Sequence, residues 1–174
     1  SVVLETGLGG RADATNVIDT PEAAAIASIS LDHTAILGDT YAKIAFEKAG
    51  IIKKGGDVVL YPVQDPSVFE TIESACNERG AHLHIPDEKN MQVNGTALTG
   101  TALTWRGLPL TLPFTGVHQV HNAATALTVL DVLREKHANI TDEALQKGFA
   151  SAYIPARMEI LSQKPLVLLD GGHN

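Results

Sequence analysis

Residues 2–16 read VVLETGLGGRADATN, an apolar run that leads directly into a glycine-rich turn. A short apolar run bounded by such a turn predicts a buried β-strand over residues 2–4. Glu5 then stands at the carboxyl end of this strand, and open α/β sheets bind ligands at that edge. The stretch therefore favours an α/β fold with polar groups gathered at one edge of the sheet.

The same turn partly fits the dinucleotide-binding pattern G-x-G-x-x-G/A through Gly7, Gly9 and Ala12, with Asp32 near the expected distance. That pattern requires a helix that begins inside the turn, so that its N-terminus meets the pyrophosphate. Residues 13–21 instead contain Asp, Asn, Thr and β-branched residues, which form helices poorly, and they end in proline. An NAD-dependent oxidoreductase stays only as a remote alternative.

The rest of the chain alternates apolar runs with helical patterns. Strands are predicted over residues 23–29, 58–61, 82–85 and 166–169, and helices over residues 40–50, 66–79, 118–136 and 141–151. Residues 91–114 alternate in part between apolar and polar side chains and predict antiparallel hairpins. This order predicts a three-layer α/β fold with a mainly parallel sheet and a small antiparallel β insertion.

Composition narrows the classes of protein. The 174 residues carry a formal charge of -7 without a basic stripe, so nucleic acid is not an expected partner. No apolar run approaches the length of a membrane span, so no membrane contact is expected. Cys76 is the only cysteine, which excludes an internal disulfide and suits a reducing compartment. We expect a cytoplasmic monomer.

Lys48 is placed unusually on the helix predicted over residues 40–50. At about 100° per residue it falls between Tyr41 and Ile44, whereas Lys43 and Glu47 share the stripe that faces solvent. Burial makes an amine nucleophilic, and a neutral lysine can take up CO2 to become a carbamate, an anionic oxygen ligand suited to Mg²⁺. The structural alternative is a long side chain that reaches the surface.

Other polar residues stand at positions where ligands are expected. Asp32 and His33 follow the strand predicted over residues 23–29, at the same sheet edge as Glu5. Structural alternatives remain open, in which Glu5 forms an ion pair with a neighbour and His33 caps the following helix. Asn122 is predicted on the apolar side of its helix, in register with Ala126. The Asn122 amide could there form hydrogen bonds with the edge of a nucleotide base or with a neighbouring backbone group. Arg157 could hold a phosphate, and Asp170 could hold a ribose hydroxyl.

Five segments are similar to one family, in the right order: VLETGLGGRADATN (residues 3–16), SLDHT (30–34), EKAGIIK (47–53), GVHQVHNA (116–123) and DGGHN (170–174). Together they resemble the dihydrofolate synthase/folylpolyglutamate synthase family, the folate branch of the Mur ligase superfamily. Two small departures are Ala156, where the family usually has Gly before the arginine, and Gly172, where it usually has Ala.

The resemblance implies metal ligands. Glu5 and His33 would bind Mg²⁺, and Lys48 would be a catalytic, carbamylated lysine that binds a second Mg²⁺. Imidazole is an unusual ligand for so hard a cation, so the role of His33 depends on the resemblance alone.

The resemblance also implies contacts with nucleotide and substrates. Asn122 would contact adenine, Arg157 the terminal phosphates of ATP, and Asp170 the ribose. His173 would be catalytic, near the acyl-phosphate or glutamate end, and Asp13 and Ala14 would touch the pterin.

The implied organisation is that of an internal piece of a longer protein. Residues 1–160 would form a partial central ATP-binding domain without the family's glycine-lysine phosphate-binding loop. Residues 161–174 would form the last strand and a linker toward a glutamate-binding C-terminal domain. Such a chain is not expected to catalyse a reaction on its own.

The implied activity is an ATP-dependent amide ligation that uses two Mg²⁺ ions. L-Glutamate would be added to 7,8-dihydropteroate, to folate or to both, through an acyl phosphate, and the sequence does not separate these acceptors. A cell-wall Mur ligase is disfavoured by residues 13–16. A non-catalytic nucleotide-binding remnant remains an alternative.

Overall fold

Three short parallel strands form the centre of the fold. The computed structural model describes residues 2–137 and 139–171. In it β1 (Ala24–Ile26), β2 (Asp57–Leu60) and β3 (His82–His84) pair in the order β1-β2-β3, with Ala24 opposite Val58 and Asp57 opposite His82. Val58, Val59 and Leu60 are buried, as expected for a parallel strand that is covered on both faces.

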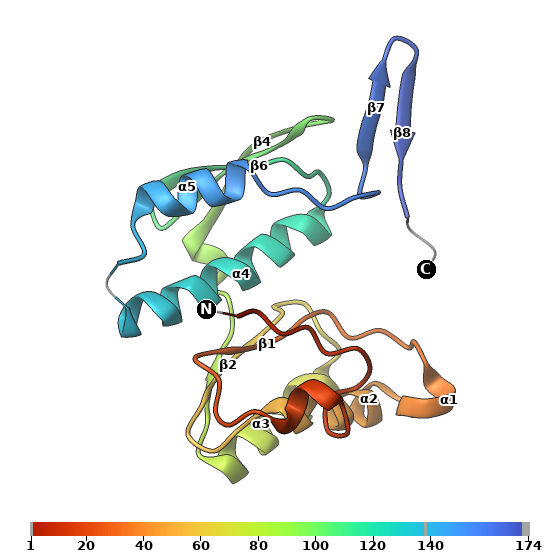
Figure 1. Cartoon of the computed structure of the whole chain (residues 1–174), viewed down its shortest axis with the longest axis vertical. Helices are drawn as coiled ribbons and strands as arrows, with labels where there is room; N and C mark the ends of the chain where they lie inside the picture. Colours follow the sequence, from red (N-terminus) through yellow and green to blue (C-terminus); the bar gives the residue numbers. More distant parts are fainter. Residues whose placement is uncertain (1, 138, 172–174) are drawn as a thin grey trace.

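Helices cover both faces of this sheet. α2 (Tyr41–Lys48) and α3 (Pro66–Arg79) pack through Ile44 and Ile72 on the core that includes Val58 and Leu60. α4 (Val117–Lys136) contacts β1 and β2 and lies on the opposite side of the sheet (Figure 1). The predicted three-layer α/β arrangement is therefore confirmed.

An antiparallel sheet packs on the other side of α4. β4 (Met91–Ala97), β5 (Gly100–Trp105) and β6 (Leu108–Leu112) form it within the segment where hairpins were predicted. α5 (Asp142–Ala150) completes this half, and a second apolar core lies between the sheet, α4 and α5 (Figure 1). Its members are Leu103, Trp105, Leu110, Leu112, Phe114, Ala123, Ala124, Leu127 and Leu145.

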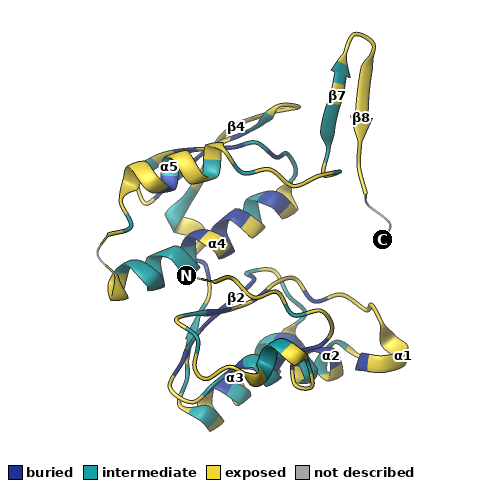
Figure 2. Ribbon diagram, in the orientation of Figure 1, coloured by how far each residue is buried: buried dark blue, intermediate teal, exposed yellow. Residues whose placement is uncertain are grey.

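The last strand differs from its expected place. β8 (Leu166–Leu169) forms as predicted, but it pairs antiparallel with β7 (Glu159–Gln163) and not with the parallel sheet. Its four apolar residues are all exposed, and the hairpin projects from the body of the molecule (Figures 1 and 2). The predicted boundary between residues 160 and 161 lies within β7 and stays a prediction.

Residues 2–4 correct the prediction of a first strand. They form no strand, and Val3 is 97% exposed (Figure 2). An extended segment is stable in a sheet only where a neighbouring strand takes up its N–H and C=O groups. Within the described residues, β1 pairs with β2 alone, and nothing pairs with residues 2–4.

Local signals explain most helix ends. α3 has the predicted bounds because the Asp65 carboxylate accepts from the Ser67 N–H, Pro66 occupies the first turn, and Gly80 takes a left-handed conformation. α2 begins after its capping residue Thr40 but ends at Lys48, earlier than the predicted residue 50, and the short turn η2 (Ala49–Ile51) follows. The remaining short helices are η1 (Ala14–Val17), α1 (Thr34–Leu37) and η3 (Glu88–Asn90).

Gly50 lies at the predicted end of this helix but does not cap it, since Ala49 is the capping residue. A Cβ at Gly50 would lie 2.2 Å from the Cα of Arg11. Glycine is needed here for close packing of two main chains rather than for a left-handed helix end.

No helix in the described ranges is both long enough and apolar enough to cross a membrane.

Candidate functional site

The Asp13 side chain organises the glycine-rich turn. One carboxylate oxygen accepts from the main-chain N–H groups of Gly7 (3.0 Å) and Leu8 (3.2 Å). The other accepts from the N–H (2.9 Å) and the hydroxyl (2.6 Å) of Thr15. These hydrogen bonds, above all those from Thr15, lower the pKa of Asp13 to about 2. The carboxylate is therefore a structural acceptor for four donors before any ligand is considered.

The turn is followed by too little helix for a dinucleotide site. η1 (Ala14–Val17) has only four residues, and Ile18 after it is extended. A pyrophosphate held by the Rossmann turn needs the N-terminus of a full crossover helix. The observed geometry thus agrees with the reasoning that set the oxidoreductase alternative aside.

The turn packs directly on the end of α2 that carries Lys48. The N–H of Arg11 donates to the carbonyl of Glu47 at 2.8 Å, and the Asn16 amide donates to the carbonyl of Gly50 at 3.1 Å. A Cβ on Gly10 would lie 2.9 Å from the carbonyl oxygens of both Glu47 and Lys48. The structure therefore joins two segments of the predicted site that are more than 30 residues apart in sequence.

Lys48 lies away from the wet side of α2, as predicted. It is half-buried, next to the buried Ala45 and Ala49. Lys43, on the other side, is exposed and pairs with Asp39 at 2.8 Å. Glu47 differs from its prediction, because Arg11 covers it and leaves its side chain only 22% exposed.

No contact joins the candidate metal ligands to one another within the described residues. Glu5 is exposed, and its carboxylate makes no hydrogen bond or ion pair with the described residues. His33 is exposed at the start of α1 in a left-handed conformation (φ 51°), makes no side-chain cap, and lies 3.8 Å from the Asp32 carboxylate. The described part of the chain holds no cluster of three or more His, Cys, Asp or Glu side chains that could bind a metal ion.

Donor chemistry decides how well these residues suit Mg²⁺. The Glu5 carboxylate supplies a hard anionic oxygen and fits. Lys48 fits only as a carbamate, because an ammonium group would repel the cation. His33 offers the nitrogen ligand that Mg²⁺ disfavours. Glu5, His33 and Lys48 thus stay predictions as metal ligands, and Glu5 and Lys48 have the better chemical grounds.

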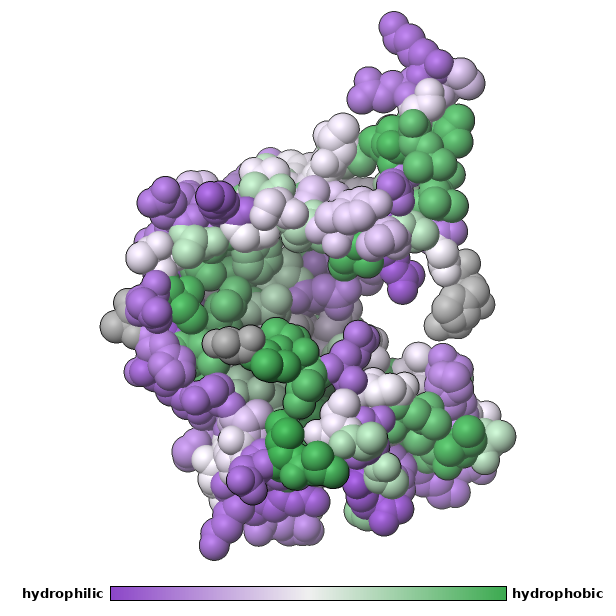
Figure 3. Space-filling view, viewed as in Figure 1, coloured by the Kyte–Doolittle hydropathy of each residue, from purple (hydrophilic) through white to green (hydrophobic). Residues whose placement is uncertain are grey.

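Asn122 borders an apolar cavity. Its side chain is exposed at the surface of α4 and donates to Gln119 at 3.2 Å. With Ala126, Leu130 and Phe149 it lines a cavity of about 600 Å³ between α4, α5 and β6, in the apolar surface region seen in Figure 3. Asn122 and Ala126 line this apolar cavity together, in the predicted register, whereas the fully buried side of α4 carries Ala123, Ala124 and Leu127.

Asp170 lies beside the main chain on either side of Arg157, at the base of the terminal hairpin. The Asp170 carboxylate accepts from the N–H of Met158 at 2.9 Å, and the N–H of Gly171 donates to Ala156 at 2.7 Å. Arg157 is exposed between these contacts. The structure therefore brings together the two residues expected to hold phosphate and ribose. His173, the other catalytic candidate, lies outside the described residues.

Ala14 lies beside Asp13 as the first, exposed residue of η1. Both could meet a ligand that approaches the glycine turn. Since the Asp13 carboxylate already accepts from four donors, a pterin contact there would share it with the turn.

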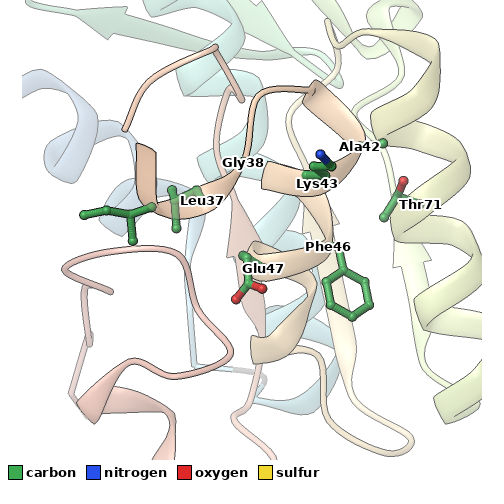
Figure 4. A pocket seen from close by; sticks show the side chains of 8 residues that line it. Leu37, Gly38, Ala42, Lys43, Phe46, Glu47 and Thr71 are labelled. Atoms are coloured by element: carbon green, nitrogen blue, oxygen red, sulfur yellow. The ribbon is translucent and has the colours of Figure 1, made fainter. Parts of the chain in front are cut away.

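Sequence reasoning missed the roles of Arg11 and Glu47. Glu47, which Arg11 pairs with, lines a second cavity of about 450 Å³ together with Phe46 and Thr71. In Figure 4 the Phe46 side chain projects from α2 toward the side of Thr71, and the Glu47 side chain projects from the opposite side of the helix. No local pattern signals a pair 36 residues apart, although both residues adjoin predicted site segments.

Comparisons with known proteins agree with this geometry. The family model for the Mur ligase middle domain matches residues 1–130. The dihydrofolate synthase/folylpolyglutamate synthase of Bacillus subtilis is 37% identical over 180 residues, which cover 99% of this chain and 41% of that protein. The chain thus spans about two fifths of the length of this relative.

Two solved structures have the same fold as the chain. The folylpolyglutamate synthase of Mycobacterium tuberculosis, complexed with ADP and AMPPCP, is 35% identical with a TM-score of 0.81, covering 97% of this chain and 40% of the other. A complex of folylpolyglutamate synthase with AMPPCP and folate is 31% identical with a TM-score of 0.85, covering 98% and 43%. The chain therefore belongs to the Mur ligase family, where it corresponds to the middle domain, and along its length it resembles dihydrofolate and folylpolyglutamate synthases.

Proposed function

We propose that this chain forms the central part of an ATP-dependent amide ligase that adds L-glutamate to 7,8-dihydropteroate, to folate or to both. The observation that carries the proposal is the similarity, over 98% of the chain, to a folylpolyglutamate synthase that binds AMPPCP and folate. A nucleotide analogue and a folate on one such scaffold are the two ligands that this reaction requires. The bifunctional name of the Bacillus subtilis relative supports both acceptors.

In the proposed reaction, a carboxylate oxygen of the acceptor attacks the γ-phosphorus of ATP, and ADP leaves. The amine of L-glutamate then attacks the acyl carbon, and phosphate leaves with the carboxylate oxygen as the amide forms. Such chemistry depends mainly on positioning and on neutralising charge. Two Mg²⁺ ions, held by Glu5, His33 and carbamylated Lys48, would supply that charge when bound.

The remaining roles are those that the family resemblance implies. Arg157 and Asp170, which lie near each other through the Met158–Asp170 hydrogen bond at the hairpin base, would hold the terminal phosphates and the ribose of ATP. Asn122, a polar group on an apolar cavity, would contact adenine. Asp13 and Ala14 would meet the pterin beside the glycine turn, and His173 would act near the glutamate end.

ADP release by the full-length protein tests this function. The protein is supplied with MgATP and L-glutamate, and either 7,8-dihydropteroate or a tetrahydrofolate is added in turn. We expect release that depends on at least one acceptor, and that acceptor names the substrate. ATP binding without acceptor-dependent release would instead support a nucleotide-binding remnant.

Lys48→Ala in the full-length protein should lower turnover by roughly 100-fold or more, the scale of losing one key electrostatic group. Lys43→Ala is the matched control, because Lys43 is exposed on the same helix and, among the described residues, forms an ion pair with Asp39 alone. Steady-state kinetics of both variants, with and without added short carboxylic acids, make the comparison. Near-normal turnover of Lys48→Ala would remove the carbamate role.

A further inference from the structure

Arg11 joins the glycine turn to the residue before Lys48 through both main chain and side chain. Its N–H donates to the Glu47 carbonyl at 2.8 Å. Its guanidinium reaches both Glu47 carboxylate oxygens, from Nε at 3.2 Å and from Nη2 at 3.0 Å. Such a two-point contact fixes orientation as well as distance. The guanidinium carbon also lies 5.8 Å from the ring centre of Phe46.

The main chains around this pair leave no space for adjustment. A Cβ on Gly10 would collide with the carbonyls of Glu47 and Lys48, and one on Gly50 would collide with Arg11. Carbonyl groups in the last turn of a helix lack donors within the helix, and here the turn supplies the donor for Glu47. The glycine turn and the Lys48 end of α2 are therefore packed closely against each other.

Stability alone does not account for the ion pair. The Arg11 side chain is 61% exposed, and ion pairs at such exposure contribute little to the free energy of unfolding. α2 is already held by its Thr40 cap and by the packing of Gly50. The two-point contact between the Arg11 guanidinium and the Glu47 carboxylate instead fixes the orientation of the end of α2 that carries Lys48.

We propose that Arg11 is a positioning residue, which acts through Glu47 to hold Lys48 in a fixed orientation relative to the glycine turn that follows Glu5. The inference depends on the proposed function, in which Glu5 and Lys48 act on the same reacting groups. Displacement of a catalytic group by about 1 Å can lower a rate by about 100-fold. A contact that fixes the position of Lys48 can therefore have a large effect on turnover.

Arg11→Met and Arg11→Lys in the full-length protein test the inference. Methionine keeps the apolar stem without the fork, and lysine keeps the charge but not the two-point geometry. The first readout is the ¹³C NMR signal of the Lys48 carbamate, recorded with ¹³C-bicarbonate and no nucleotide. The second is the separation of kcat from KM for ATP, and thermal melting verifies folding.

We expect Arg11→Met to lower kcat roughly 10-fold with KM for ATP changed less than about twofold, and to alter the intensity or chemical shift of the carbamate signal. The kcat and the carbamate signal of Arg11→Lys should be intermediate between those of Arg11→Met and the unaltered protein. If Arg11→Met does not fold, the test uses Arg11→Lys alone. Asp39→Asn is the matched control, because it removes an exposed ion pair of the same helix without touching the turn.

Two failures can be told apart. A wild-type carbamate signal and kcat in the folded Arg11 variants would overturn the positioning role alone. Absence of any carbamate signal in the unaltered protein would overturn the proposed state of Lys48 and, with it, this inference.

Discussion

Asp13 holds the glycine turn as a charged acceptor, and its effect on stability should depend on pH. Its folded pKa of about 2 lies below the ordinary value of 3.8. A lowered carboxylate pKa stabilises the fold fully above the unfolded value, and that contribution is lost as the pH falls through the folded value. Stabilisation by Asp13 should therefore be complete near neutrality and disappear between about pH 4 and pH 2.

Asp13→Asn measures this contribution, since the amide keeps the shape but offers a donor to the N–H groups of the turn. The melting temperature of the variant should be lower than that of the unaltered protein at pH 7, and the two should converge toward pH 2. A difference in melting temperature that does not change with pH would show that charge is not what Asp13 contributes.

Ala156 is a second residue whose backbone conformation predicts a measurable effect. Its φ of 55° lies in the left-handed region, where a side chain costs roughly 1–2 kcal/mol and glycine costs nothing. Glycine loses more entropy on folding, by roughly 0.5–1 kcal/mol. Ala156→Gly should therefore raise the free energy of unfolding by up to about 1 kcal/mol in urea titrations. Destabilisation would mean that the Ala156 methyl contributes packing.

At the same scale, the sequence predicted Lys48 by helical register, because the register depends only on neighbours along α2. The sequence could not predict that Glu47 is partly buried, because the Arg11 side chain that shields it from solvent lies 36 residues away in the chain. It also could not indicate that Asp13, chosen as a pterin contact by resemblance, is already saturated by the turn. Single residues were predictable where their surroundings are local.

At the scale of elements, two glycines in helical segments have opposite surroundings, one open and one closely packed. Nothing lies within 4 Å of a Cβ built on Gly148 in α5, whereas one on Gly50 meets the Arg11 backbone. Gly148→Ala should stabilise the protein by about 0.5–1 kcal/mol through helix propensity. Gly50→Ala should destabilise it, because two main chains must separate. Urea titrations of the two variants give the comparison, and equal effects would contradict the packing of the turn on α2.

The C-terminal end of α4 is fixed to the parallel sheet through Asp57. The Asp57 carboxylate accepts from Lys136 at 2.7 Å and from His84 at 2.8 Å, and its side chain is only 14% exposed. Burial alone would raise the pKa of Asp57, but the hydrogen bonds from Lys136 and His84 outweigh burial and the pKa is lowered. This contact joins α4 to the parallel sheet.

Lys136→Met should therefore lower the free energy of unfolding by about 1 kcal/mol, since a buried carboxylate loses one of its donors but keeps His84. Lys147→Met is the control, because Lys147 is exposed on α5 and forms no ion pair with the described residues. Denaturant titration measures both. Equal stability of the two variants would show that the Asp57 contact contributes nothing.

Elements with local start and stop signals were predicted well. α3 matches its predicted bounds because a capping aspartate, a first-turn proline and a left-handed glycine all lie within the segment. Residues 2–4 and 166–169 have the same apolar character, yet only the second forms a strand, because only it has a partner beside it. Strand pairing depends on the neighbouring chain, which periodicity does not reveal.

At the scale of the whole molecule, α4 separates two cores, one under the parallel sheet and one under the antiparallel sheet (Figure 1). The candidate residues are divided in the same way. Glu5, His33 and Lys48 belong to the parallel half, and Asn122, Arg157 and Asp170 follow in the second half and the hairpin. Under the proposed function, ATP would contact residues of both halves.

The most direct measurement follows one oxygen atom through the reaction. The acceptor is labelled with ¹⁸O in its reacting carboxylate, and the full-length protein is given MgATP and L-glutamate. An acyl-phosphate ligase must release phosphate that carries one ¹⁸O, together with ADP and an amide product heavier by one glutamyl residue. Amide product with unlabelled phosphate would contradict the acyl phosphate, and the absence of both products would contradict the ligase.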